Sequence, residues 1–98
     1  MATNAEIIKE VADHVTKRGG AYSQWYAGVA ANARERLFND HNVDEKNGVW
    51  IFRNCASTDQ ARAVEDHFLA KGMKGGPGGG DDDTTYVYAY KITSTTKE

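Results

Sequence analysis

The sequence predicts a small α/β domain of the α+β type, in which three helices cover a three-stranded sheet in the order α-β-α-β-α-β. Three observations predict it. Helical apolar stripes follow capping residues at two places, aromatic and β-branched runs separate the helical segments, and 98 residues suffice for one core but not for two. We therefore expect one domain over residues 1–98.

The first helix follows a capping box. Thr3 precedes Glu6 by three positions, and aliphatic residues then recur at helical spacing, at Ile7, Ile8, Val11 and Val15. The pair Gly19-Gly20 ends this helix, because glycine is the preferred residue after a helix C-terminus.

A strand and a short helix follow. Residues 21–30 are rich in aromatic residues, and Gly28 among them indicates a close backbone approach or a bulge. Asn32 is a suitable N-cap for a helix over residues 33–40. The polar segment 42–48 ends in Asn-Gly, which is typical of a turn.

The second half repeats this alternation. Residues 49–56 are expected to form a strand, and Ser57 with Gln60 begins a third helix that ends before Gly72. Residues 84–92 alternate regularly and form the last strand, with Tyr86, Tyr88, Tyr90 and Ile92 on one face.

Two segments lack such patterns. Residues 73–83 are rich in glycine and end in three aspartates, so we expect a flexible connector or flap. A calcium site at Asp81–Asp83 is a weaker alternative. The loop does not match a phosphate-binding P-loop, which enters a helix after a strand. The tail 93–98 is expected to fray.

Net charge and the distribution of apolar residues limit the partners and the location that we expect for the protein. The net charge of −2 and the pI near 5.9 do not favour nucleic-acid binding, although they leave it open. No apolar run is long enough to span a membrane, and the N-terminus lacks the pattern of a signal peptide, so we expect a cytoplasmic protein without a membrane partner. Cys55 lies in an apolar run and is expected to be buried rather than nucleophilic.

Glu65 and Arg36 are the residues with the clearest chemical potential. Glu65 falls on or beside the apolar stripe of the third helix, so its carboxylate must be paired, bind a cation or bear the cost of desolvation. Pairing with an arginine is one interpretation, and a metal-ligand or acid role is the other. Arg36 lies nearer the inward face of its helix than Arg34, and it either clamps a phosphate or forms a salt bridge with Glu65, Glu35 or Asp40.

Together these elements resemble the GIY-YIG nuclease superfamily. Tyr26-Ala27-Gly28 is similar to the Tyr-x-Gly strand end of that family, and Arg36 follows Tyr26 by ten residues, as the family arginine does. His41 comes one position later than the usual polar residue one turn beyond the arginine. The segment 61–65 is similar to the helix that carries the family glutamate, and the match covers roughly residues 22–70.

The resemblance implies metal-dependent cleavage of nucleic acid. Glu65 would hold one Mg²⁺ or Mn²⁺, Arg36 would stabilise charge on the phosphate, and Tyr26 with His41 would handle the attacking water and its proton. Arg34 and Tyr88 would bind substrate.

One family strand is missing from its usual place. A helix precedes Tyr26 where the family has its Gly-Ile-Tyr strand, and the terminal run YVYAYKI could replace that strand in a permuted arrangement, with Tyr86, Tyr88 or Tyr90 as the family tyrosine.

The alternative function is a non-catalytic binding module. It would engage a protein or small ligand through the aromatic terminal strand and the Gly-rich flap. The protein is expected to be a monomer, or a dimer if that terminal strand lies at a sheet edge and pairs with a second copy.

Overall fold

The computed structural model describes residues 3–19, 21–55, 57–75 and 84–97. It confirms a mixed α+β fold with three helices and a three-stranded antiparallel sheet. The elements are α1 (Asn4–Arg18), β1 (Trp25–Ala30), α2 (Ala33–Glu35), β2 (Trp50–Asn54), α3 (Thr58–Ala70) and β3 (Tyr86–Lys91).

The last strand of the chain is the central strand of the sheet. The order is β1-β3-β2, and β3 runs antiparallel to both neighbours, so that Tyr88 lies opposite Gly28 on one side and Phe52 on the other. The expectation of a dimer through an edge position of this strand is therefore wrong, because the backbone of β3 is paired on both sides. The open edge belongs to β2, while Lys74 forms a parallel bridge with Tyr26 beyond β1.

The helices begin where the sequence predicts. At α1 the Thr3 side chain accepts a hydrogen bond from the Glu6 backbone N–H, and the Glu6 carboxylate accepts one from the Thr3 backbone N–H, which confirms the capping box. The Ser57 side chain caps α3 by accepting from the Gln60 backbone N–H. Gly19 follows α1 with φ of +79°, in the left-handed range that glycine tolerates.

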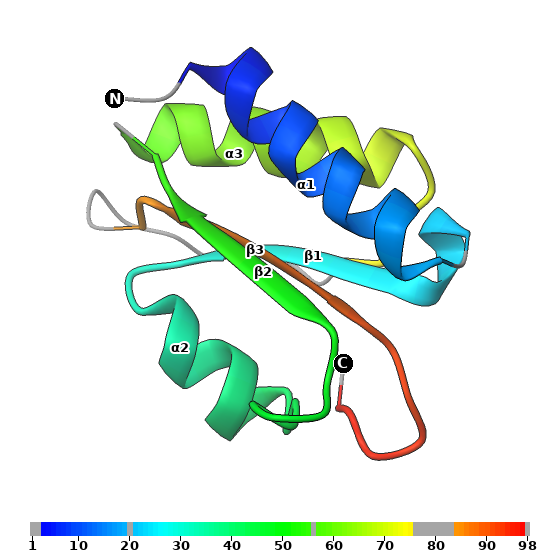
Figure 1. Ribbon diagram of the computed structural model, residues 1–98. Coiled ribbons are helices and arrows are strands. Elements are labelled where there is room, and N and C mark those ends of the chain that lie inside the picture. Colours follow the sequence, from blue (N-terminus) through cyan, green and yellow to red (C-terminus); the bar gives the residue numbers. More distant parts are fainter. Residues whose placement is uncertain (1–2, 20, 56, 76–83, 98) are drawn as a thin grey trace.

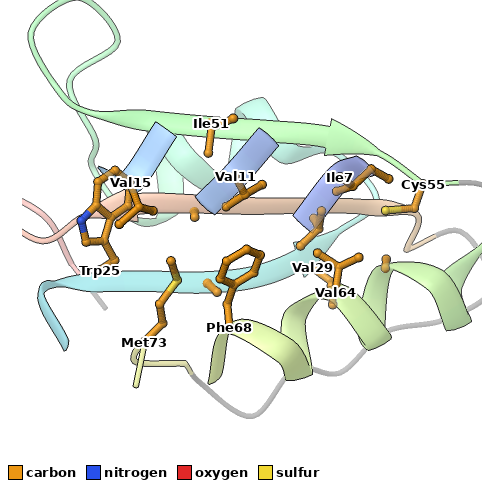
Figure 2. Close-up of a cluster of buried hydrophobic side chains, with 14 residues drawn as sticks. Ile7, Val11, Val15, Trp25, Val29, Ile51, Cys55, Val64, Phe68 and Met73 are labelled. Atoms are coloured by element: carbon orange, nitrogen blue, oxygen red, sulfur yellow. The ribbon is translucent and has the colours of Figure 1, made fainter. Parts of the chain in front are cut away.

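Helices cover both faces of the sheet (Figure 1). The helices α1 and α3 lie side by side on one face, and α2 lies on the other. The larger core fills the first face with aliphatic residues around Trp25 and Phe68 (Figure 2). The smaller core lies against α2 and contains three tyrosines among aliphatic residues, comprising Tyr26, Ala30, Ala33, Leu37, Val43, Tyr88 and Tyr90.

The helix predicted for residues 33–40 changes its winding midway. After α2 the chain continues as a π-helical turn over Arg36–Asp40 (η2), in which the His41 backbone N–H donates to the Arg36 carbonyl at 2.9 Å. A π turn accommodates one residue more than an α turn, and such turns occur often at functional sites. The strand predicted for residues 21–30 is also shorter than expected, because Tyr22–Gln24 form a 3₁₀ turn before β1 begins.

The tail folds back onto the domain instead of fraying. The Lys97 backbone N–H donates to the His41 carbonyl at 2.7 Å, and the Asn42 side chain donates to the Thr95 carbonyl at 2.8 Å. Met73 is buried, so the start of the predicted flexible loop is also ordered. The rest of that loop, with its aspartates and the calcium alternative, lies outside the described residues. Over the part of the chain that the structure describes, no helix is long and apolar enough to cross a membrane.

Candidate functional site

The hydroxyl group of Tyr88 lies at the centre of a buried polar cluster. Nε2 of His41 is 2.7 Å from this hydroxyl, and Nδ1 of His41 is 2.6 Å from the Lys97 carbonyl. A carbonyl only accepts hydrogen bonds, so Nδ1 carries a hydrogen. In the neutral imidazole Nε2 then offers its lone pair, and the Tyr88 hydroxyl donates to it.

Two further tyrosines hold the His41 ring in place. The Tyr26 ring stacks on the Tyr90 ring with 5.2 Å between centroids, and it lies 4.7 Å from the His41 ring. The Tyr90 hydroxyl also donates to the Lys97 carbonyl, at 3.2 Å. Because Tyr90 is fully buried, packing fixes the orientation of this group before any ligand arrives.

Gly28 makes room for Tyr88. A Cβ atom placed on Gly28 would lie 2.5 Å from the Tyr88 hydroxyl oxygen and 2.6 Å from Cζ, which is closer than side chains approach one another. The Tyr88 ring therefore crosses β1 directly above the glycine backbone. This is the close backbone approach that the glycine inside the strand predicts.

Titratable groups on three elements act on the same hydroxyl. Burial is the main reason why the pKa of Tyr88 is raised far above its ordinary value, and Tyr26, Glu65 and Asp40 raise it further. The Arg36 guanidinium acts in the opposite direction. The residues Tyr26, Arg36, His41 and Glu65, which were selected from the sequence, thus all influence Tyr88.

Glu65 is a buried carboxylate that forms no salt bridge among the described residues. Its side chain is only 7% exposed, and burial, with a smaller effect of Asp66, raises its pKa, while Arg62 lowers it. Among the described residues no hydrogen bond or salt bridge holds the carboxylate. Arg62 therefore acts on this carboxylate through its charge, and the raised pKa shows the cost of desolvation that its place on the apolar stripe predicts.

Arg36 and Arg34 lie outside this buried cluster. Arg36 is half-exposed and lies 3.6 Å from the Asp40 carboxylate, which is one of the salt bridges expected for it. Arg34 forms a salt bridge with Glu45 and covers the Phe38 ring with 5.2 Å to the centroid. Arg34 thus faces the β2 side of the molecule and does not join the Tyr88 cluster.

The sequence places Tyr90 on the same face of the sheet as Tyr88, because the two residues alternate along the strand. It gives no signal for the Lys97 carbonyl, which sequence reasoning missed. Elsewhere, Cys55 is buried as expected, and burial raises the pKa of its thiol.

Comparison with protein-family models, with curated proteins and with solved structures finds no match for this chain. The resemblance to GIY-YIG nucleases consequently stays a prediction. Within the described residues there is also no group of three or more His, Cys, Asp or Glu side chains suited to hold a metal ion. A cation at this site would therefore rely on Glu65 and on ligands other than these side chains.

Proposed function

We propose that the Tyr88 cluster hydrolyses phosphodiester bonds of nucleic acid with the help of a divalent cation, as a permuted relative of the GIY-YIG nucleases. The observation that carries the proposal is the hydrogen bond between the Tyr88 hydroxyl and Nε2 of His41, whose ring packs on Tyr26. The charges of Arg36 and Glu65 also act on the Tyr88 hydroxyl. In this reaction a water oxygen bonds to phosphorus while the bond to the leaving oxygen breaks.

Each group has a role that its surroundings allow. The Tyr88 oxygen positions the attacking water and takes its proton as the Tyr88 hydroxyl proton moves to Nε2 of His41, whose lone pair already accepts that hydrogen bond. Tyr26 packs against the His41 ring and keeps it in place. The half-exposed Arg36 is the group that a phosphate would meet, and its guanidinium suits the charge that develops there.

The chemistry of Glu65 fits a divalent cation. A buried carboxylate with a raised pKa and no salt bridge among the described residues would be stabilised by a divalent cation. Mg²⁺ is commonly held by one or two carboxylates together with water and phosphate oxygens, so a single glutamate suffices. When bound, Mg²⁺ or Mn²⁺ would polarise the phosphate as a Lewis acid.

Two structural features support the resemblance. The π turn lengthens one helical turn by a residue, which accounts for a His41 that comes one position late in the sequence. In addition, β3 lies directly beside β1, so Tyr88 stands opposite the glycine of the Tyr26-Ala27-Gly28 motif. A tyrosine from the end of the chain can therefore take the role of the tyrosine that the missing strand would carry.

Plasmid nicking in Mg²⁺ or Mn²⁺ tests the proposal. We expect activity in the wild type, and a loss of at least about a hundredfold in Glu65→Gln and in Tyr88→Phe, since each removes a group that acts on the reacting atoms. Asp13→Asn is the charge-matched control, because Asp13 is an exposed residue of α1. Activity that survives both substitutions, or that is absent from folded wild-type protein, contradicts the proposal.

The binding-module alternative keeps little of its expected surface. The structure buries Tyr88 and Tyr90 under α2, so that only Tyr86 and Ile92 of the aromatic face are half-exposed. The Gly-rich part of the flap lies outside the described residues. We therefore place the catalytic proposal first.

A further inference from the structure

A continuous groove follows the open edge of the sheet, away from the Tyr88 cluster. Three adjoining hollows of about 380, 350 and 320 Å³ form it. The first and second share Arg34 and Phe52, and the second and third share His14 and Trp50. The edge strand β2 has α1 and α2 on opposite sides of the sheet (Figure 1). Because residues of α1, α2 and β2 line the hollows, the groove wraps around this edge.

Aromatic rings form a row along this groove. The rings of Trp50 and Phe52 are stacked, with 5.8 Å between centroids and 7° between planes. Tyr86 lies next to this pair, with its ring centroid 6.0 Å from that of Phe52 and its plane inclined by 70°, in an edge-to-face arrangement. All three residues are only partly buried, although exposed aromatic side chains are costly in water. Such a row is suited to stacking with planar groups.

The groove is cationic although the protein carries a net charge of −2. Its lining contains four cationic side chains, Arg18, Arg34, Lys46 and Arg53, but the single carboxylate of Glu45. No salt bridge within the described residues involves Arg18 or Lys46. Arg34 pairs with Glu45 and Arg53 with Glu10, but such exposed pairs contribute only about 0–1 kcal/mol, so an incoming anion can replace them.

The edge is poorly suited to another strand. The backbone groups of Phe52 face away from β3, so they are the groups that an added strand would pair with. The Arg53 side chain already donates to the Phe52 carbonyl, at 2.8 Å. A pairing strand would have to displace this contact and the Arg53–Glu10 salt bridge at 2.5 Å. A second copy of the chain, or a peptide added as a strand, therefore fits the edge less well than a ligand that carries both anions and flat rings.

We infer that this groove binds single-stranded nucleic acid. Its bases would stack on Trp50, Phe52 and Tyr86, and its phosphates would contact the cations of the groove. Proteins that bind single strands combine these two features, a basic track and a stacking platform. The inference requires neither Glu65 nor a cation, and it therefore stands independently of the proposed hydrolysis.

Fluorescence anisotropy with a labelled oligothymidylate in EDTA tests the inference, because hydrolysis is then excluded. We expect Phe52→Ala to weaken binding about fivefold to a hundredfold, from the contribution of one stacked base. We expect Arg18→Ala/Lys46→Ala to reduce the slope of log K against log salt by about 1.4, at about 0.7 per phosphate contact. Lys9→Ala/Lys71→Ala is the charge-matched control, since both lysines are exposed and lie outside the groove.

The controls separate this inference from its rivals. A duplex of the same sequence should bind more weakly, because paired bases cannot stack on the groove. Equal binding of duplex, equal binding of polyglutamate, or an unchanged affinity in both groove variants overturns the inference. So does a dimer in sedimentation that Phe52→Ala dissociates. A lost affinity in Phe52→Ala counts as support only if its melting temperature shows that the variant is folded.

Discussion

Replacing Gly28 by alanine should destabilise the protein, because the added methyl group overlaps the Tyr88 ring. The new Cβ would lie 2.5 Å from the hydroxyl oxygen and 2.6 Å from Cζ, whereas carbon atoms pack at about 3.5–4.0 Å. Tyr88 is 4% exposed and its hydroxyl is bound to His41, so the ring cannot move aside and keep that hydrogen bond. Overpacking of this kind costs about 1–3 kcal/mol.

A double-mutant cycle measures the overlap directly. In a Tyr88→Leu background the methyl group has room, and Gly28→Ala should be neutral or slightly stabilising, since alanine loses less conformational freedom on folding than glycine. Urea unfolding should therefore give a coupling free energy of about 1–3 kcal/mol, and Gly28→Ala alone should lower Tm by about 4–8 °C for each kcal/mol.

Tyr86→Leu provides the matched background, because Tyr86 belongs to the same strand and face but lies opposite Ala30. Gly28→Ala should be additive with it, within about 0.5 kcal/mol. Additivity of Gly28→Ala with Tyr88→Leu as well would refute the placement of the Tyr88 ring above Gly28.

Three further outcomes are expected. Tyr88→Phe leaves Nε2 of His41 buried without a donor, so it should cost about 1–3 kcal/mol in urea unfolding, and a cost as small as that of Tyr86→Phe would argue against the hydrogen bond. Burial raises the pKa of Glu65 above its ordinary value of 4.5, so the folded state binds the carboxyl proton more tightly than the unfolded state does. The contribution of Glu65 to stability is therefore present at low pH and is lost as the pH rises above 4.5 and the carboxyl group ionises. The free energy of unfolding of Glu65→Gln relative to wild type should accordingly increase between about pH 4 and about pH 8, and a constant difference contradicts the burial. The Cys55 thiol, whose pKa is raised by burial, should react with Ellman's reagent much more slowly in native protein than in urea, and equal rates would contradict its inaccessible position.

The fold could be predicted where local signals and periodicity agree. Thr3 and Ser57 mark helix starts because their side chains satisfy backbone N–H groups at once, whatever the rest of the chain does. The position of β3 in the centre of the sheet could not be predicted in this way, since strand order depends on the packing of helices on both faces. The alternation of YVYAYKI specifies its two faces, but not its neighbours.

The candidate site shows the same division. The burial of Glu65 follows from its place on the apolar stripe of α3, and the closeness of Gly28 to another side chain follows from a glycine inside a strand. The π turn is different, because its residues, Arg36–Asp40, also suit a regular helix. The folded structure buries Leu37 within this turn and His41 at its end.

The tail illustrates why a residue's chemical role can escape the sequence altogether. Residues 93–97 have the composition of a solvent-exposed end, yet a Thr93–Thr96 turn brings the Lys97 carbonyl to Nδ1 of His41. This one backbone acceptor sets the tautomer of the imidazole and so turns Nε2 toward Tyr88 as an acceptor. Any side chain at position 97 would supply the same carbonyl, so the identity of that residue carries no information about the contact. The base in the proposed reaction therefore depends on chain geometry, and only the folded structure reveals it.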